Sequence, residues 1–111
     1  MANELILIVE DNENNRMLVR DLLQSRGYRT EETDTAEEGL RQAHALRPAL
    51  ILMDIQLPGM NGMDALRHLR ADAATRDIPV MAVTASAMTQ DRQQIMAAGF
   101  DAYQSKPIAV R

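Results

Sequence analysis

The stretch "LILMDIQLPGMNG", residues 50–62, begins with four apolar residues and then places a carboxylate, Asp54, directly after them. Consecutive apolar residues of this kind are typical of a strand that is buried on both faces, as in a parallel sheet. Pro58 and Gly59 follow, which indicates that the strand ends in a tight loop. A charge at the end of a buried strand needs a partner from elsewhere in the fold.

Short apolar runs alternate with amphipathic stretches along the rest of the chain. We expect strands at residues 5–9, 28–33, 50–53, 80–84 and 101–105, and helices at residues 14–26, from a cap at 34 or 35 to about 47, after a cap at Asn61, and at 90–98. This alternation predicts an α/β fold with a doubly wound, five-stranded parallel sheet of order 2-1-3-4-5, flavodoxin-like. The two most apolar strands should lie in its centre. The fifth helix should be missing or truncated, because few residues follow the last strand.

The first expected helix has an apolar face. Its apolar residues recur at helical spacing, so we expect Leu18, Val19, Leu22 and Leu23 to lie on one face of the helix. Gly27 should stop this helix.

Composition limits the classes of protein to consider. The 111 residues suit one domain, 1–111, and 46% of them are hydrophobic. The net charge of −4 argues against a surface that binds nucleic acid. The chain has no cysteine, which excludes disulfides and thiolate metal sites. Its apolar runs are too short for a membrane span, and "MANELILIVED" lacks a basic leader, so we expect a cytoplasmic protein without membrane contact.

Polar residues stand at the carboxyl ends of four of the five expected strands. Glu10 and Asp11 come after the first strand, Asp54 after the third and Lys106 after the fifth, while Thr84 is the last residue of the fourth. The carboxyl ends of parallel strands meet at one edge of the sheet, so these residues should converge there.

Gathered carboxylates repel one another, and a cation would offset their charge. Oxygen ligands without cysteine favour a hard ion, Mg²⁺ or Mn²⁺. A metal beside a carboxylate suggests phosphoryl chemistry, with Asp54 as the nucleophile. Lys106 and Thr84 would then contact the phosphoryl oxygens.

Four stretches of the chain resemble a known family, the receiver domain of two-component response regulators. They are "LIVEDN" (7–12), "LILMDIQLPGMNG" (50–62), "IPVMAVTA" (78–85) and "YQSKPI" (103–108). They occur in the family's order and spacing and span nearly the whole chain. The sequence is most similar to single-domain receivers of the DivK type, and receivers attached to hybrid histidine kinases share much of it.

The resemblance implies a role for each converging residue. Asp54 would be the phosphoacceptor and would share Mg²⁺ with Asp11 and the backbone carbonyl of Gln56. Glu10 would reach the metal through water. Thr84 and Lys106 would contact the phosphoryl group.

The resemblance also implies a switch and its partners. After phosphorylation Thr84 would move toward the new oxygens, Tyr103 would turn inward, and a cis bond before Pro107 would aim Lys106 at the site. The donor would be a histidine kinase or histidine phosphotransfer protein, docked on the first helix near Asn14, Asn15 and Leu18. Output would be contact with a downstream protein, and the exposed fifth-helix surface could form a homodimer.

Two other functions fit the same fold. A Mg²⁺-dependent phosphatase with an aspartate nucleophile needs an acid two residues later as a proton donor, and that position holds Gln56. A flavodoxin-like nucleotide binder needs a glycine-rich or hydroxyl-rich loop after the first strand, where this chain has the acidic "EDNENN".

Overall fold

Strands and helices alternate along the chain in the computed structural model, which describes residues 4–55, 57, 59–84 and 89–105, with the backbone alone for 84, 89–92, 104 and 105. In chain order the elements are β1 (Leu5–Val9), α1 (Glu13–Ser25), β2 (Arg29–Thr33), α2 (Ala36–Leu46), β3 (Leu50–Asp54), α3 (Gly62–Ala71), β4 (Val80–Thr84), α4 (Thr89–Ala97) and β5 (Ala102–Ser105).

All strand pairs in the sheet are parallel, and the strand order is β2-β1-β3-β4-β5. The predicted fold class and order are therefore confirmed. The polar strand β2 lies at one edge, and the apolar strand β3 lies in the centre beside β1. The described residues contain four helices, in agreement with the prediction that the fifth is missing or truncated.

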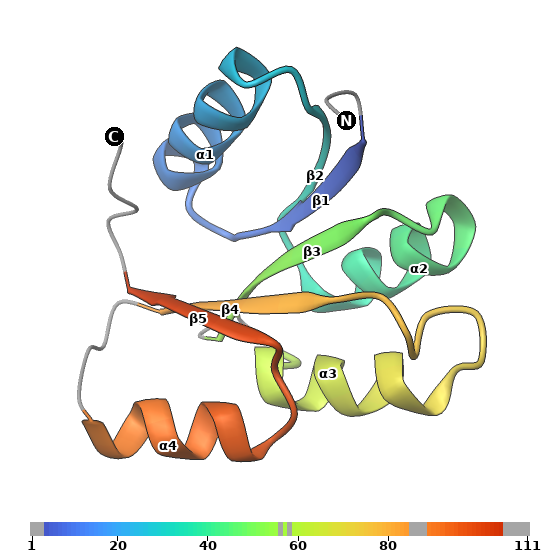
Figure 1. Cartoon of the computed structure of the whole chain (residues 1–111), viewed down its shortest axis with the longest axis vertical. Helices are drawn as coiled ribbons and strands as arrows, with labels where there is room; N and C mark the ends of the chain where they lie inside the picture. Colours follow the sequence, from blue (N-terminus) through green and yellow to red (C-terminus); the bar gives the residue numbers. More distant parts are fainter. Residues whose placement is uncertain (1–3, 56, 58, 85–88, 106–111) are drawn as a thin grey trace.

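Helices cover both faces of the sheet, with α1 on one face and α2, α3 and α4 on the other (Figure 1). Successive residues of a strand point to opposite faces. Ile8 therefore packs in the cluster below α1 with Val19 and Leu52. Leu7 lies in the larger cluster with residues of α2 and α3, including Ala43 and Leu66.

Polar side chains begin three of the described helices; the sequence indicated the caps at Thr35 and Asn61 but not the one at Asn12. Asn12, Thr35 and Asn61 cap α1, α2 and α3, and each accepts a hydrogen bond from a backbone N–H three residues later. After α1 the chain turns at Gly27, with a φ of 90°, a conformation that costs glycine little.

Leu18 is 42% exposed, as the predicted contact with a partner requires, and Val19 is the buried residue of α1. The structure corrects one detail of the prediction. Asp54 does not follow the third strand but is its last residue.

No helix within the described residues has the length and apolar character needed to cross a membrane.

Candidate functional site

Asp54 is held at the end of the central strand. Its neighbour in the register of β4 is Val83, and the N–H of Ile55 donates to the carbonyl oxygen of Val83 at 3.0 Å. The ladder therefore continues one residue beyond Asp54, which keeps the backbone of Asp54 rigid. The residue is 2% exposed, although it carries an ionisable group.

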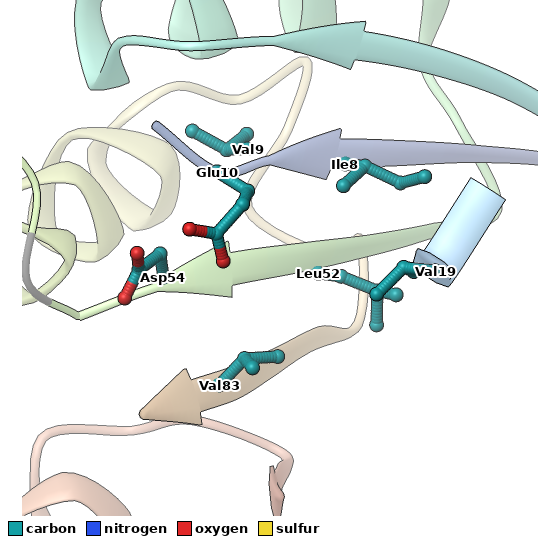
Figure 2. Close-up of a pocket in the computed structure, with 7 residues that line it drawn as sticks. All are labelled: Ile8, Val9, Glu10, Val19, Leu52, Asp54 and Val83. Atoms are coloured by element: carbon teal, nitrogen blue, oxygen red, sulfur yellow. The ribbon is translucent and has the colours of Figure 1, made fainter. Parts of the chain in front are cut away.

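Glu10 lies beside Asp54, just after β1, and is 4% exposed. Its N–H donates to the carbonyl oxygen of Thr33 at 3.0 Å, and its carboxylate accepts the N–H of Asn12 at 3.1 Å. Figure 2 shows the carboxylates of Glu10 and Asp54 next to each other at the ends of their strands. Asp11, the following residue, is exposed.

The acids of the two strand ends form one cluster. Glu10, Asp11 and Asp54 each offer a carboxylate oxygen, and these oxygens all lie within 4.8 Å of one another. Two oxygens on opposite sides of a Mg²⁺ ion are about 4.2 Å apart, because each bond is about 2.1 Å long. Small side-chain rotations would bring the cluster to that size. The donors are oxygen alone, so the residues present fit Mg²⁺.

A small cavity of about 10 Å³ lies beneath the two buried carboxylates (Figure 2). Its walls are Glu10 and Asp54 on one side and apolar residues on the other, including Val19, Leu52 and Val83. This volume is near the smallest that holds one water molecule. The carboxylates are thus backed by an apolar floor, which limits their contact with solvent to the open edge of the sheet.

For the other predicted site residues, the structure describes only part of each side chain's surroundings or none of them. Thr84 is the last residue of β4, and the structure describes its backbone only. Tyr103 lies in β5, half-buried against the larger core cluster. Gln56, Lys106 and Pro107 lie outside the described residues, so their predicted roles remain predictions.

Sequence reasoning missed the role of Gly62 in this site. Its N–H donates to the carbonyl oxygen of Ile55 at 3.0 Å, which closes the loop after β3. A Cβ on Gly62 would come 2.5 Å from the carbonyl oxygen of Asp54, closer than real Cβ atoms approach. The glycine therefore lets α3 begin directly against the backbone of Asp54. The sequence signals only a loop glycine here, because this contact depends on the fold.

Comparisons with known proteins agree with this geometry. A family model described as the response regulator receiver domain matches residues 6–111. The polar-differentiation response regulator DivK of Brucella anthropi is 50% identical over 105 residues, covering 95% of this chain and 85% of that protein. DivK of Brucella ovis is 49% identical with the same coverage, 95% and 85%.

Solved structures show the same fold. The receiver domain of a sensor histidine kinase from Pseudomonas aeruginosa PAO1, with a magnesium ion coordinated in its active site cleft, has a TM-score of 0.89 and 37% identity. The similarity covers 97% of this chain and 88% of that one. The chemotaxis protein CheY4 of Vibrio cholerae has a TM-score of 0.89 and 26% identity, covering 97% and 90%.

Proposed function

This chain belongs to the receiver-domain family of response regulators, and from this premise we propose that Asp54 accepts a phosphoryl group with the help of Mg²⁺. The observation that carries the proposal is the cluster of Glu10, Asp11 and Asp54, with carboxylate oxygens within 4.8 Å of one another. Packing gains nothing from gathering three like charges, so a function that uses them is the better explanation.

The proposed metal ligands are Asp11, Asp54 and the backbone carbonyl of Gln56, with Glu10 acting through water. Mn²⁺ has similar ligand preferences and could replace Mg²⁺. When bound, the ion supplies positive charge that offsets the charge on the phosphoryl oxygens. The burial of Glu10, which is 4% exposed, gives it a defined position beside Asp54.

The proposed donor is the phosphohistidine of a histidine kinase or a histidine phosphotransfer protein. A carboxylate oxygen of Asp54 forms a bond to phosphorus while the bond between phosphorus and the imidazole nitrogen breaks, and the electron pair of that bond stays on the nitrogen. The rigid end of β3 holds Asp54 so that it presents this oxygen at the open edge of the sheet. Asn14 and Leu18 on α1, both exposed, are the proposed contacts for the donor.

Thr84 and Lys106 are the proposed contacts for the phosphoryl oxygens. Thr84 ends β4, and Lys106 directly follows Ser105, the last residue of β5. Because parallel strands end at one edge of a sheet, we expect both at the edge that carries Asp54. A cis bond before Pro107 is part of the same proposal, because it would direct Lys106 inward.

The phosphoryl group adds about −1.5 to −2 charge at pH 7, which biases two pre-existing states of the domain. We assign the change between them to Thr84, which moves toward the new oxygens, and to Tyr103, which turns further inward. The protein is thus a switch rather than an enzyme that turns over a substrate. Its output is contact with a downstream protein in the cytoplasm, in a process like the polar differentiation named for the DivK relatives.

Incubation with acetyl phosphate and Mg²⁺, followed by intact-mass measurement, tests the proposal. The wild type should gain one phosphoryl group, and the gain should be absent in Asp54→Asn or with a chelator. Asp21→Asn removes an exposed carboxylate of α1 and is the matched control, which should still gain the group. A gain of mass in Asp54→Asn equal to that of the wild type would contradict the proposal.

A further inference from the structure

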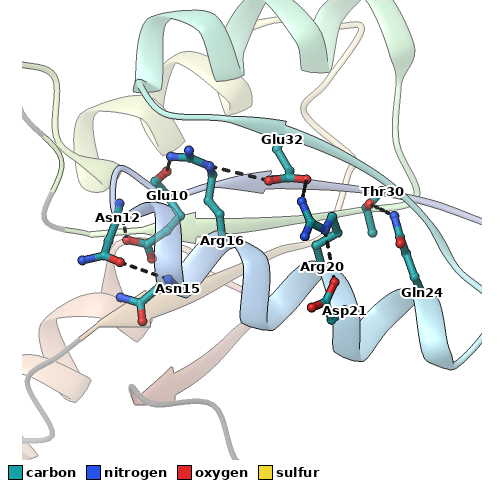
Figure 3. Close-up of polar contacts among 9 residues, drawn as sticks. All are labelled: Glu10, Asn12, Asn15, Arg16, Arg20, Asp21, Gln24, Thr30 and Glu32. Atoms are coloured by element: carbon teal, nitrogen blue, oxygen red, sulfur yellow. Dashed lines mark hydrogen bonds and ion pairs between the residues drawn. The ribbon is translucent and has the colours of Figure 1, made fainter.

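Arg16 of α1 lies between Glu10, one of the three clustered acids, and Glu32 of β2 (Figure 3). One guanidinium nitrogen, Nη1, donates to the carbonyl oxygen of Glu10 at 2.8 Å. Its Nε faces the carboxylate of Glu32 on β2 at 3.6 Å. The side chain is 19% exposed, so solvent does not replace these contacts freely. From this geometry we infer that Arg16 is a positioning residue for the magnesium site, an inference that rests on the function proposed above.

The guanidinium is itself held in place. Glu32 forms an ion pair with Arg16 and accepts a hydrogen bond from Arg20, one turn further along α1, at 3.4 Å (Figure 3). A guanidinium is planar and presents several donors in a fixed arrangement, so a contact on one side orients the donor on the other. Glu32 therefore directs Arg16 toward Glu10.

The hydrogen bond from Arg16 adds to two others that hold Glu10 in place. The N–H of Glu10 donates to Thr33, its carboxylate accepts the N–H of Asn12, and its carbonyl oxygen accepts from Arg16. The carbonyl of Glu10 and the N–H of Asp11 belong to one planar peptide unit. A hydrogen bond that fixes this carbonyl therefore also fixes the orientation of the peptide unit that leads into Asp11. Through one hydrogen bond Arg16 orients two of the three clustered acids.

Positioning and simple charge predict opposite effects on Mg²⁺ affinity. Arg16 is positively charged and would repel a cation bound by the acids, so its removal should strengthen Mg²⁺ binding if charge alone matters. If Arg16 positions the ligands, its removal should weaken binding, because partners that orient metal ligands typically contribute about 10-fold or more to affinity. The sign of the change therefore decides between the two roles.

The test is a titration of each variant with Mg²⁺, followed by the NMR shifts of backbone amides. Arg16→Ala should weaken Mg²⁺ binding about 10-fold. Arg16→Lys keeps the charge but cannot contact Glu10 and Glu32 through one planar group, so it should bind with intermediate affinity. Arg20→Ala loses a charge on the same Glu32 without touching Glu10, and should bind Mg²⁺ like the wild type. Thermal unfolding of each variant confirms that it is folded.

The outcomes separate this inference from the function on which it rests. Wild-type affinity or tighter binding in Arg16→Lys, and in Arg16→Ala where that variant folds, overturns the positioning role alone. Weakened binding in Arg20→Ala equal to that in Arg16→Ala also overturns it, because the effect would then not depend on the hydrogen bond to Glu10, which Arg20 does not make. A wild type that does not bind Mg²⁺ overturns the proposed function.

Discussion

Gly62 and Asp54 are in backbone contact: a Cβ on Gly62 would lie 2.5 Å from the carbonyl oxygen of Asp54 and 2.9 Å from the Cα of Ile55. The atoms in the way belong to the backbone of β3 and of the residue after it, which cannot move aside as a flexible side chain can. The start of α3 and the end of the central strand therefore set each other's position.

Gly62→Ala should displace the end of β3 and with it the carboxylate of Asp54. We expect a loss of stability of about 1–3 kcal/mol, as for other overpacked sites. We also expect phosphorylation by acetyl phosphate to slow, by up to about 100-fold if the displacement approaches 1 Å. Gly39→Ala is the control, since its Cβ would meet the side chain of Val9 at 2.8 Å. The prediction fails if Gly62→Ala, once folded, accepts the phosphoryl group as fast as Gly39→Ala.

Asp54→Asn should stabilise the protein in the presence of a chelator, because it relieves repulsion among the clustered acids. Two like charges at 4.8 Å near a protein surface interact by about 1–3 kcal/mol, which sets the expected gain. Mg²⁺ at ten times its dissociation constant should stabilise the wild type by about 1.4 kcal/mol. Urea unfolding with and without Mg²⁺ measures both. A variant that is less stable than the wild type in chelator would argue against strain from charge at this site.

Arg70 of α3 forms hydrogen bonds that hold in place the segments preceding β4 and β5. Its guanidinium donates to the carbonyl oxygens of Arg76 at 2.9 Å and Ile78 at 2.8 Å, and to the carboxylate of Asp101 at 2.8 Å. Arg70→Ala should cost about 2–4 kcal/mol, because it leaves several carbonyl groups without their donor. Arg67→Ala, which removes an exposed pair with Asp64, should cost under about 0.5 kcal/mol. Equal unfolding free energies for the two variants would refute this account of Arg70.

Asp72, after α3, should make stability depend on pH. The N–H of Ala74 donates to its carboxylate, and His44 also contacts it, and both lower the pKa of Asp72. A lowered folded pKa means that stability is present above the unfolded pKa of about 3.9 and is lost as pH falls through the folded pKa. The advantage of the wild type over Asp72→Asn should therefore shrink below about pH 4 in unfolding experiments. A constant difference from neutral to acidic pH would contradict it.

The spacing of apolar residues and the capping residues predicted the helices and strands well, because these elements depend mainly on residues close together in the chain. The run at Leu5–Val9 and the cap at Asn61 appear in the structure as expected. The apolar spacing alone did not show that Val19 would be buried while Leu18, the residue before it, stays exposed, because this depends on how α1 packs on the sheet. The strand that ends with Asp54 was predicted one residue short because a charge was taken as its end, whereas the ladder continues to Ile55.

The site could be predicted only in outline. The rule that parallel strands end at one edge brings Glu10, Asp11 and Asp54 together, and the structure shows the same convergence. The contact of Gly62 with β3 and that of Arg16 with Glu10 were not predictable, because both depend on how a helix approaches the sheet. A single sequence contains no local pattern that indicates how closely a helix packs against the sheet.

The central claim is that Asp54 itself carries the phosphoryl group, and borohydride reduction tests it at the level of the residue. An acyl phosphate is reduced to an alcohol, whereas an unmodified carboxylate is not. After treatment with acetyl phosphate and Mg²⁺, peptide mass spectrometry of the reduced protein should find homoserine in place of Asp54 and unchanged aspartate at Asp11. Homoserine at Asp11, or a phosphorylated protein in which Asp54 remains unreduced, would contradict the account.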